Sequence, residues 1–163
     1  MRRLYLFPLA LLILVLALIL LHGPSTPSLP LNQSSINEIF GPGKILNSSG
    51  VIEISNGTPV LKTLGGLSIP AYDFLGVYLP SQVKGGVVEE VEGNGYHLLV
   101  VYLELKDVVP SNYTQVVNGT NDTILIVHRG YGEVDLTYFG GHLSQGQIHE
   151  LVAMLVFDLR RGQ

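Results

Sequence analysis

The sequence contains no cysteine and no tryptophan, and only 13% of its 163 residues are charged. Without cysteine the chain can form no disulfide, thiolate zinc site, iron–sulfur cluster or cysteine-ligated copper centre, so its stability must come from packing alone. Nine Lys and Arg residues stand against thirteen Asp and Glu residues. Because nucleic acid requires clustered basic side chains, this balance argues against a nucleic-acid partner.

A long apolar run occupies the N-terminus. Residues 4–21 carry no charged or strongly polar side chain, and Pro8 is their only interruption. Eighteen helical residues extend about 27 Å, which approaches the roughly 30 Å hydrocarbon core of a bilayer. We therefore expect residues 1–22 to form a membrane anchor that contacts lipid through residues 4–21. The alternative is a cleaved signal peptide, for which Gly23-Pro24-Ser25 would be a poor cleavage site.

The charges that flank the apolar run predict its orientation. Arg2 and Arg3 precede it, and no Lys or Arg follows it until Lys44. Because positive charges favour the cytoplasmic side, we expect a single-pass protein of the cell membrane with a cytoplasmic N-terminus. The remainder of the chain would then be extracytoplasmic.

The asparagines support this location. Six of the eight begin an N-x-[ST] triplet in which x is not proline. Ser and Thr make up about 11% of the chain, so chance alone gives about one such triplet. The sequence therefore predicts N-glycosylation, which occurs on the outer side of a membrane. The predicted acceptors are Asn32, Asn47, Asn56, Asn112, Asn118 and Asn121.

Composition divides the part that follows the anchor into two. Residues 23–35 contain three prolines, four serines, one threonine and no charge, a composition that stays extended instead of packing. We expect residues 23–40 to form a Pro/Ser-rich stalk. Residues 41–163 have the length and hydrophobicity of one extracytoplasmic β-rich domain.

Apolar residues between turn signals predict strands after residue 50. Asn56-Gly57, the strongest short hairpin signal, lies between expected strands at 51–55 and 59–64. The stretch 96–105 has a continuous apolar centre, which predicts a central strand buried on both faces. The other strands are expected at 69–79 (broken), 87–92, 114–117, 123–128 and 133–139.

The end of the chain shows two clear periodicities. In the strand at 133–139, every second residue is apolar, which predicts one dry and one wet face. Ser144 and Gln147 fit a capping box, and a stripe of apolar residues at helical spacing follows, so we expect a helix over 144–161. The stripe consists of Ile148, Leu151, Val152, Leu155, Val156 and Leu159. The predicted fold class is mainly β (α+β), a β-sandwich or half-open barrel of about six to eight strands capped by this helix.

Residues with chemical potential do not form a diagnostic motif. His97, His128, His142 and His149 could bind a metal, but the sequence has no H-x-H or H-E-x-x-H spacing. No G-x-S-x-G turn marks a serine nucleophile. The carboxylates of Glu89, Glu90, Glu92 and Glu104 are better explained as a solvated face of a hairpin than as an acid–base pair. We therefore predict no catalytic, cofactor-binding or metal-binding residue and no cofactor.

These observations favour a non-catalytic binding, structural or accessory-subunit role for a membrane-anchored domain. Its expected partner, besides the bilayer, is another membrane or surface protein, or a second copy of the chain. Two alternatives remain open: an anchored extracellular hydrolase or metal enzyme, and a surface-filament subunit secreted after signal cleavage.

Overall fold

The computed structural model describes residues 33–161. The expected anchor at residues 1–22, the first part of the expected stalk and Asn32 lie outside these residues. Within 33–161, no helix combines the length and the apolar character needed to cross a membrane.

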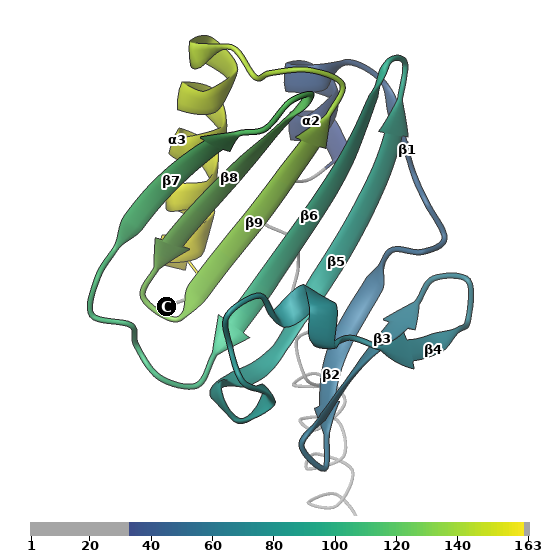
Figure 1. The fold of residues 1–163 in the computed structure, drawn as a ribbon, viewed down its shortest axis with the longest axis vertical. Coiled ribbons are helices and arrows are strands. Elements are labelled where there is room, and N and C mark those ends of the chain that lie inside the picture. The colour runs from purple at the N-terminus through teal and green to yellow at the C-terminus, as the bar shows by residue number, and fades with distance from the viewer. Residues whose placement is uncertain (1–32, 162–163) are drawn as a thin grey trace, which may run out of the picture.

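Nine antiparallel strands join into one sheet in the described part of the chain (Figure 1). Neighbouring strands follow the order β4-β3-β2-β5-β6-β9-β8-β7, and β1 pairs with the far end of β5. The count exceeds the expected range by one strand, β1, whose three residues are too few to show a periodicity. The strands are β1 Gly43–Ile45, β2 Gly50–Ser55, β3 Thr58–Thr63, β4 Ser68–Pro70, β5 Val83–Gly93, β6 Tyr96–Leu105, β7 Tyr113–Asn118, β8 Asp122–Arg129 and β9 Gly132–Phe139.

Tight turns explain why consecutive strands pair. Asn56 and Gly57 have φ angles of 50° and 78°, the positive values that a two-residue primed turn requires at both central positions. This turn joins β2 to β3 in the expected hairpin. The other two expected hairpins, β5 with β6 and β8 with β9, are also present.

Strand β6 is the central strand that its apolar sequence predicts. It lies between β5 and β9, and its residues alternate between two hydrophobic cores, one on each face of the sheet. The helix-side core contains Ile36, Val91, Tyr96, Leu98, Val100, Leu125, Val127, Val134, Leu136, Leu143, Leu151, Leu155 and Leu159. The opposite-side core contains Ile52, Leu61, Ala71, Leu75, Val83, Val88, Val101, Leu103 and Leu105.

The C-terminal helix α3, Gln145–Arg161, covers one face of the sheet (Figure 1). Its capping box forms as predicted: the Ser144 amide donates to Gln147 Oε1 at 3.0 Å, and the Gln147 amide donates to Ser144 Oγ at 3.3 Å. Leu151 and Leu155 are fully buried in the helix-side core. The expected helix and its docking on the sheet are therefore confirmed.

Helix α2, Gln33–Phe40, replaces the last part of the expected stalk. Ile36 is fully buried in the helix-side core, and the Phe40 ring stacks on Tyr138 with 5.5 Å between centroids. The short apolar patch at the end of the stalk sequence is thus long enough to form two helical turns that dock on the domain.

The sequence 69–79 does not form the expected broken strand. Strand β4 ends at Pro70, and two 3-10 turns follow: η1, Tyr72–Leu75, and η2, Pro80–Gln82. Between them Gly76 adopts a φ of 57°, which disfavours a continuous strand. Leu75 is buried in the opposite-side core. Residues 71–82, here called the covering segment, therefore lie across part of the sheet face opposite α3 (Figure 1).

The expected mainly β domain with a C-terminal helix is confirmed. Its layers resemble a sandwich in that both faces of the sheet carry a hydrophobic core. The two helices lie on one face of the sheet, and the covering segment lies over part of the other face.

Docking of α3 predicts an unequal response to two substitutions in that helix. Leu155→Ala should lower the free energy of unfolding by about 2 to 5 kcal/mol, because it leaves a cavity in a fully buried position. Glu150→Ala changes an exposed side chain and should cost less than about 0.5 kcal/mol. Urea unfolding of both variants measures the difference. Equally mild effects would mean that α3 does not stabilise the domain.

Candidate functional site

The sequon asparagines in the described residues are all exposed. Asn47 and Asn56 lie in turns, Asn112 directly precedes β7, Asn118 ends β7, and Asn121 lies in the connection to β8. A glycosyltransferase needs such access to the asparagine side chain. Glycosylation at these positions stays a prediction, and their positions meet its steric requirement.

The face of the sheet opposite α3 is only partly covered. Paired residues of neighbouring strands point to the same side, so the registers of β6, β9, β8 and β7 place six side chains together on this side. Phe139 and Val117 are 42% and 41% exposed, and the other four are half-buried. We call this surface the open face: Leu99, Val117, Ile124, Ile126, Thr137 and Phe139.

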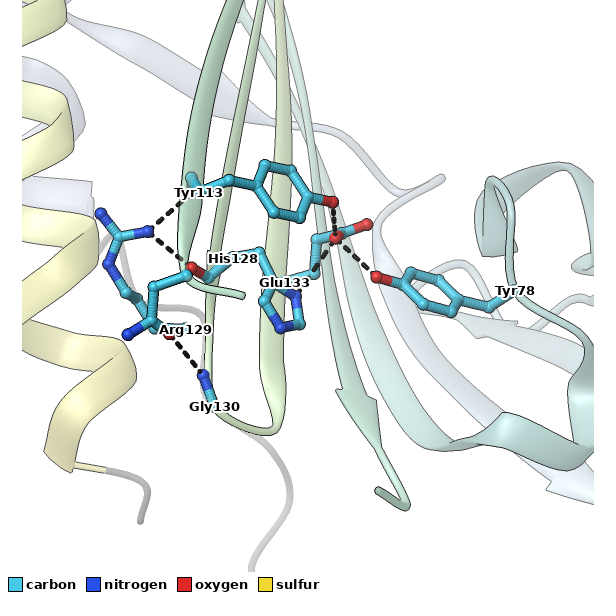
Figure 2. A network of polar contacts seen from close by, with 7 residues as sticks. Tyr78, Tyr113, His128, Arg129, Gly130 and Glu133 are labelled. Atoms are coloured by element: carbon cyan, nitrogen blue, oxygen red, sulfur yellow. Dashed lines mark hydrogen bonds and ion pairs between the residues drawn. The ribbon is translucent and has the colours of Figure 1, made fainter. Parts of the chain in front are cut away.

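A buried polar cluster lies on the same side of the sheet as the open face. Glu133 on β9 is only 5% exposed, and its Oε2 accepts hydrogen bonds from Tyr113 OH at 2.5 Å and from Tyr78 OH at 2.7 Å (Figure 2). Tyr78 comes from the covering segment and Tyr113 from β7. One carboxylate oxygen therefore ties the covering segment and the last strand of the sheet to β9.

His128 completes the cluster but is poorly bonded. It is fully buried, and its ring stacks on Tyr113 with 5.3 Å between centroids. His128 Nδ1 lies 3.3 Å from Glu133 Oε2, within reach of an ion pair, yet neither ring nitrogen makes a hydrogen bond with acceptable geometry. This approach of His128 to Glu133 is a close contact and not a hydrogen bond, because no proton on the ring points toward the carboxylate.

Asp135 adds a second buried carboxyl group two residues after Glu133 in β9. Its Oδ1 has no hydrogen-bond partner, and a Cβ placed on Gly76 of the covering segment would lie 3.8 Å from Oδ2. Burial, followed by the negative charge of Glu133, raises the pKa of Asp135 to about 7. The Asp135 carboxyl therefore keeps its proton to a higher pH than an exposed aspartate does.

The two phenols of the cluster have raised pKa values as well. Burial, followed by the hydrogen bond to Glu133, raises the pKa of Tyr113 to about 12. The same two causes raise the pKa of Tyr78 further. Both phenols stay protonated at physiological pH and act as donors to Glu133. His128 and Glu133 are almost fully buried, and the cluster joins the covering segment to β7, β8 and β9.

A second polar group contains the residue types of a serine hydrolase in the wrong order. Ser48 Oγ donates to Glu90 Oε2, and His97 Nε2 lies 3.0 Å from Glu90 Oε1. In a catalytic triad the histidine stands between the serine and the carboxylate, so that it can take the hydroxyl proton. Here the carboxylate stands between them, so Ser48 lacks the histidine base of a triad.

The structure does not bring the predicted candidate ligands together. His142 Nε2 lies 2.9 Å from the carbonyl oxygen of Gly119, and His149 is exposed on α3. Within residues 33–161, no three His, Cys, Asp or Glu side chains are grouped as a metal site requires. Glu89 and Glu90 alternate along β5 and therefore point to opposite faces of the sheet.

Comparisons with protein-family models, curated proteins and solved structures found no match to this chain.

Sequence analysis missed the polar cluster because its members are distant along the chain. Tyr78 and Glu133 are 55 residues apart, and the strand containing Glu133 is expected to expose it on a wet face. The covering segment instead lies over the part of that face that carries Glu133. The aromatic residues of the sequence between Pro70 and Pro80 were the available signal, since a loop rich in large side chains usually packs against something.

The raised pKa of Asp135 predicts a pH-dependent stability. Between about pH 4 and 7 the folded protein retains a proton that the unfolded chain has released, so stability should fall as the pH rises through this window. Asp135→Asn removes the titration and should raise the free energy of unfolding at pH 8 by on the order of 1 to 4 kcal/mol, with little effect at pH 4. Urea unfolding across this pH range measures both values.

Glu89 provides a matched control for that experiment. Burial raises the pKa of Glu89 to about 6, so its window ends at a lower pH. Glu89→Gln should flatten the profile only below about pH 6 and leave the decline between pH 6 and 7 in place. If Asp135→Asn leaves that upper decline unchanged, Asp135 is not the group that holds the proton.

Proposed function

We propose that this chain is a membrane-anchored, N-glycosylated extracytoplasmic domain with a non-catalytic binding role, and that the open face receives its partner. The anchor would be residues 4–21, and the N-terminus would lie in the cytoplasm. The partner we propose is another membrane or surface protein, to which this chain serves as an accessory subunit.

The proposed binding role rests on the open face. It presents apolar side chains in adjacent rows of a rigid sheet, and α3 on the other side already supplies the core that the sheet needs for stability. An apolar surface of this kind on a monomer is typical of an interaction site. The nearly buried polar cluster and the inverted order of Ser48, Glu90 and His97 do not favour a hydrolase.

Charge around the open face indicates the chemistry of the partner. The charged or titratable side chains beside it are His97, Asp122 and Asp135, with Glu90 and Glu92 on β5 and Lys44 of β1 opposite Glu92. After the anchor, the chain has seven basic and thirteen acidic residues, which gives a net charge of about −6. We infer a partner with an apolar patch that basic side chains surround.

The anchor is tested by extraction. If residues 4–21 span the bilayer, membranes washed with carbonate should retain the full-length chain, with Met1 or Arg2 at its N-terminus. Terminal sequencing of the retained and released fractions provides the measurement. A soluble product that begins near Thr26 would replace the anchor with a cleaved signal peptide and favour the secreted filament subunit.

The binding face is tested by site-specific photocrosslinking in native membranes. A photoreactive amino acid at Phe139 or Val117 should give a discrete crosslinked species, and its yield should fall as salt concentration rises. Leu67, which is 65% exposed in the turn between β3 and β4, is the matched control. Equal yields at the three positions would contradict a binding role for the open face. A crosslinked species of twice the chain mass would identify a second copy as the partner.

A further inference from the structure

Strand β7 gives the sheet an unprotected edge. It is the last strand in the order, and it pairs with β8 in one continuous register from Tyr113 to Asn118. Its first residue is half-buried and the other five are exposed. The sequence Tyr-Thr-Gln-Val-Val-Asn contains no charge and no proline, and Val116 and Val117 are 39% and 41% exposed. An uncharged edge of this composition is a template for pairing with another chain.

The other edges of the sheet have the usual protection. Strand β4 has only three residues and ends in Pro70, which has no amide to donate. Strand β1 also has three residues and carries Lys44 at its centre. Shortness, proline and lysine are the devices that prevent edge pairing in natural sheets. The residues of β7 itself supply none of them, nor a register shift that would mark a bulge. Arg129 of β8 places a charged group at the start of the strand, where it donates to the Tyr113 carbonyl and to Thr114 Oγ1.

Predicted glycan acceptors instead bracket this edge. Asn112 immediately precedes the first residue of β7, Asn118 is its last residue, and Asn121 follows three positions later. Three of the five sequon asparagines in residues 33–161 therefore lie within ten positions of one another at a single strand. The other two, Asn47 and Asn56, lie in turns at β2.

Hydrogen bonds fix the two bracketing asparagines without using the atom that carries a glycan. Asn112 Oδ1 accepts from the amide of Gly130 at 3.3 Å, and Asn118 Oδ1 accepts from Thr123 Oγ1 at 2.9 Å. A glycan is attached through Nδ2. Both side chains are therefore held against the sheet by one end while the other end remains available for modification.

We propose that N-glycans on Asn112 and Asn118 shield the edge of β7 and keep the protein from pairing with a second copy of itself through that strand. An added strand would lie about 4.8 Å from β7 along its whole length, so a bulky group at each end obstructs its approach. The inference rests on the extracytoplasmic location proposed above.

The modification itself requires a lipid-linked oligosaccharide and the transferase of the host. Asparagine Nδ2 forms a bond to the anomeric carbon of the first sugar, and the bond from that carbon to the phosphate oxygen breaks. The lipid phosphate leaves with the electron pair, and the amide nitrogen loses one proton.

The test compares two pairs of substitutions in the full-length chain, purified in detergent from its native host. Asn112→Gln with Asn118→Gln removes the glycans beside β7, and Asn47→Gln with Thr58→Val, which destroys the sequon of Asn56 without changing its turn, removes the same number elsewhere. Sedimentation should show at least about tenfold stronger self-association for the first pair only. Intact-mass analysis of the unsubstituted protein establishes which asparagines are occupied.

A third substitution separates edge pairing from misfolding. Val116→Lys, added to the Asn112 and Asn118 variant, places a charge on the edge and on the side of the sheet away from the open face. It should restore the monomer, which it would not do if the variant associated because it was misfolded. Association that persists in this variant would overturn the inference.

The remaining outcomes separate this inference from the proposed location. Glycans at Asn112 and Asn118 whose removal leaves the protein monomeric would overturn the shielding role alone. A native protein with the bare polypeptide mass would overturn both the shielding role and the evidence that the sequons give for an extracytoplasmic domain.

Discussion

A single open sheet has two faces to cover, and this domain has one long helix. Helix α3 supplies fully buried leucines to one face, and most of the buried apolar residues of β6, β8 and β9 belong to the core on its side. The opposite face therefore receives only the covering segment, which is short and mainly 3-10. Because it cannot extend over all four strands from β6 to β7, the open face follows from the number and length of the covering elements.

The covering segment must be held without the usual means. The chain has no cysteine for a disulfide, and the segment forms no long pairing with the sheet. Ala71 and Leu75 anchor it in the opposite-side core, and the hydrogen bond from Tyr78 to Glu133 gives it a polar contact. Hydrogen bonds to a charged group contribute roughly 1.5 to 3 kcal/mol, more than neutral ones. Burying Glu133, His128 and Asp135 offsets part of that gain, since three of their nitrogen and oxygen atoms have no hydrogen-bond partner.

Local signals in the sequence were sufficient for the hairpins and the helix, because each depends on neighbouring residues. Asn56-Gly57 selects its turn, and Ser144 with Gln147 selects the start of α3. The covering segment and the polar cluster depend on contacts between residues as far apart as Tyr78 and Glu133, and the aromatic residues of the segment do not indicate which strand they pack against. The alternation in β9 correctly separated its two faces. It could not reveal that Pro70, Gly76 and Pro80 would turn the chain back over the polar one.

The low charge of the chain is a common cause of the apolar open face and of the uncharged sequence of β7. Soluble domains commonly keep apolar faces and edges apart with charged side chains, which make up about 25% of an average sequence. Here the charged fraction is 13%, and β7 has no charge at all. A charge on the side of β7 that faces α3 would adjoin the helix-side core. A charge on the opposite side would adjoin the open face. The proposed glycans would give the edge hydration and bulk from its two ends, and they leave both faces of the strand apolar. On this proposal, glycans and not charged residues of β7 would limit the surface that a partner can reach.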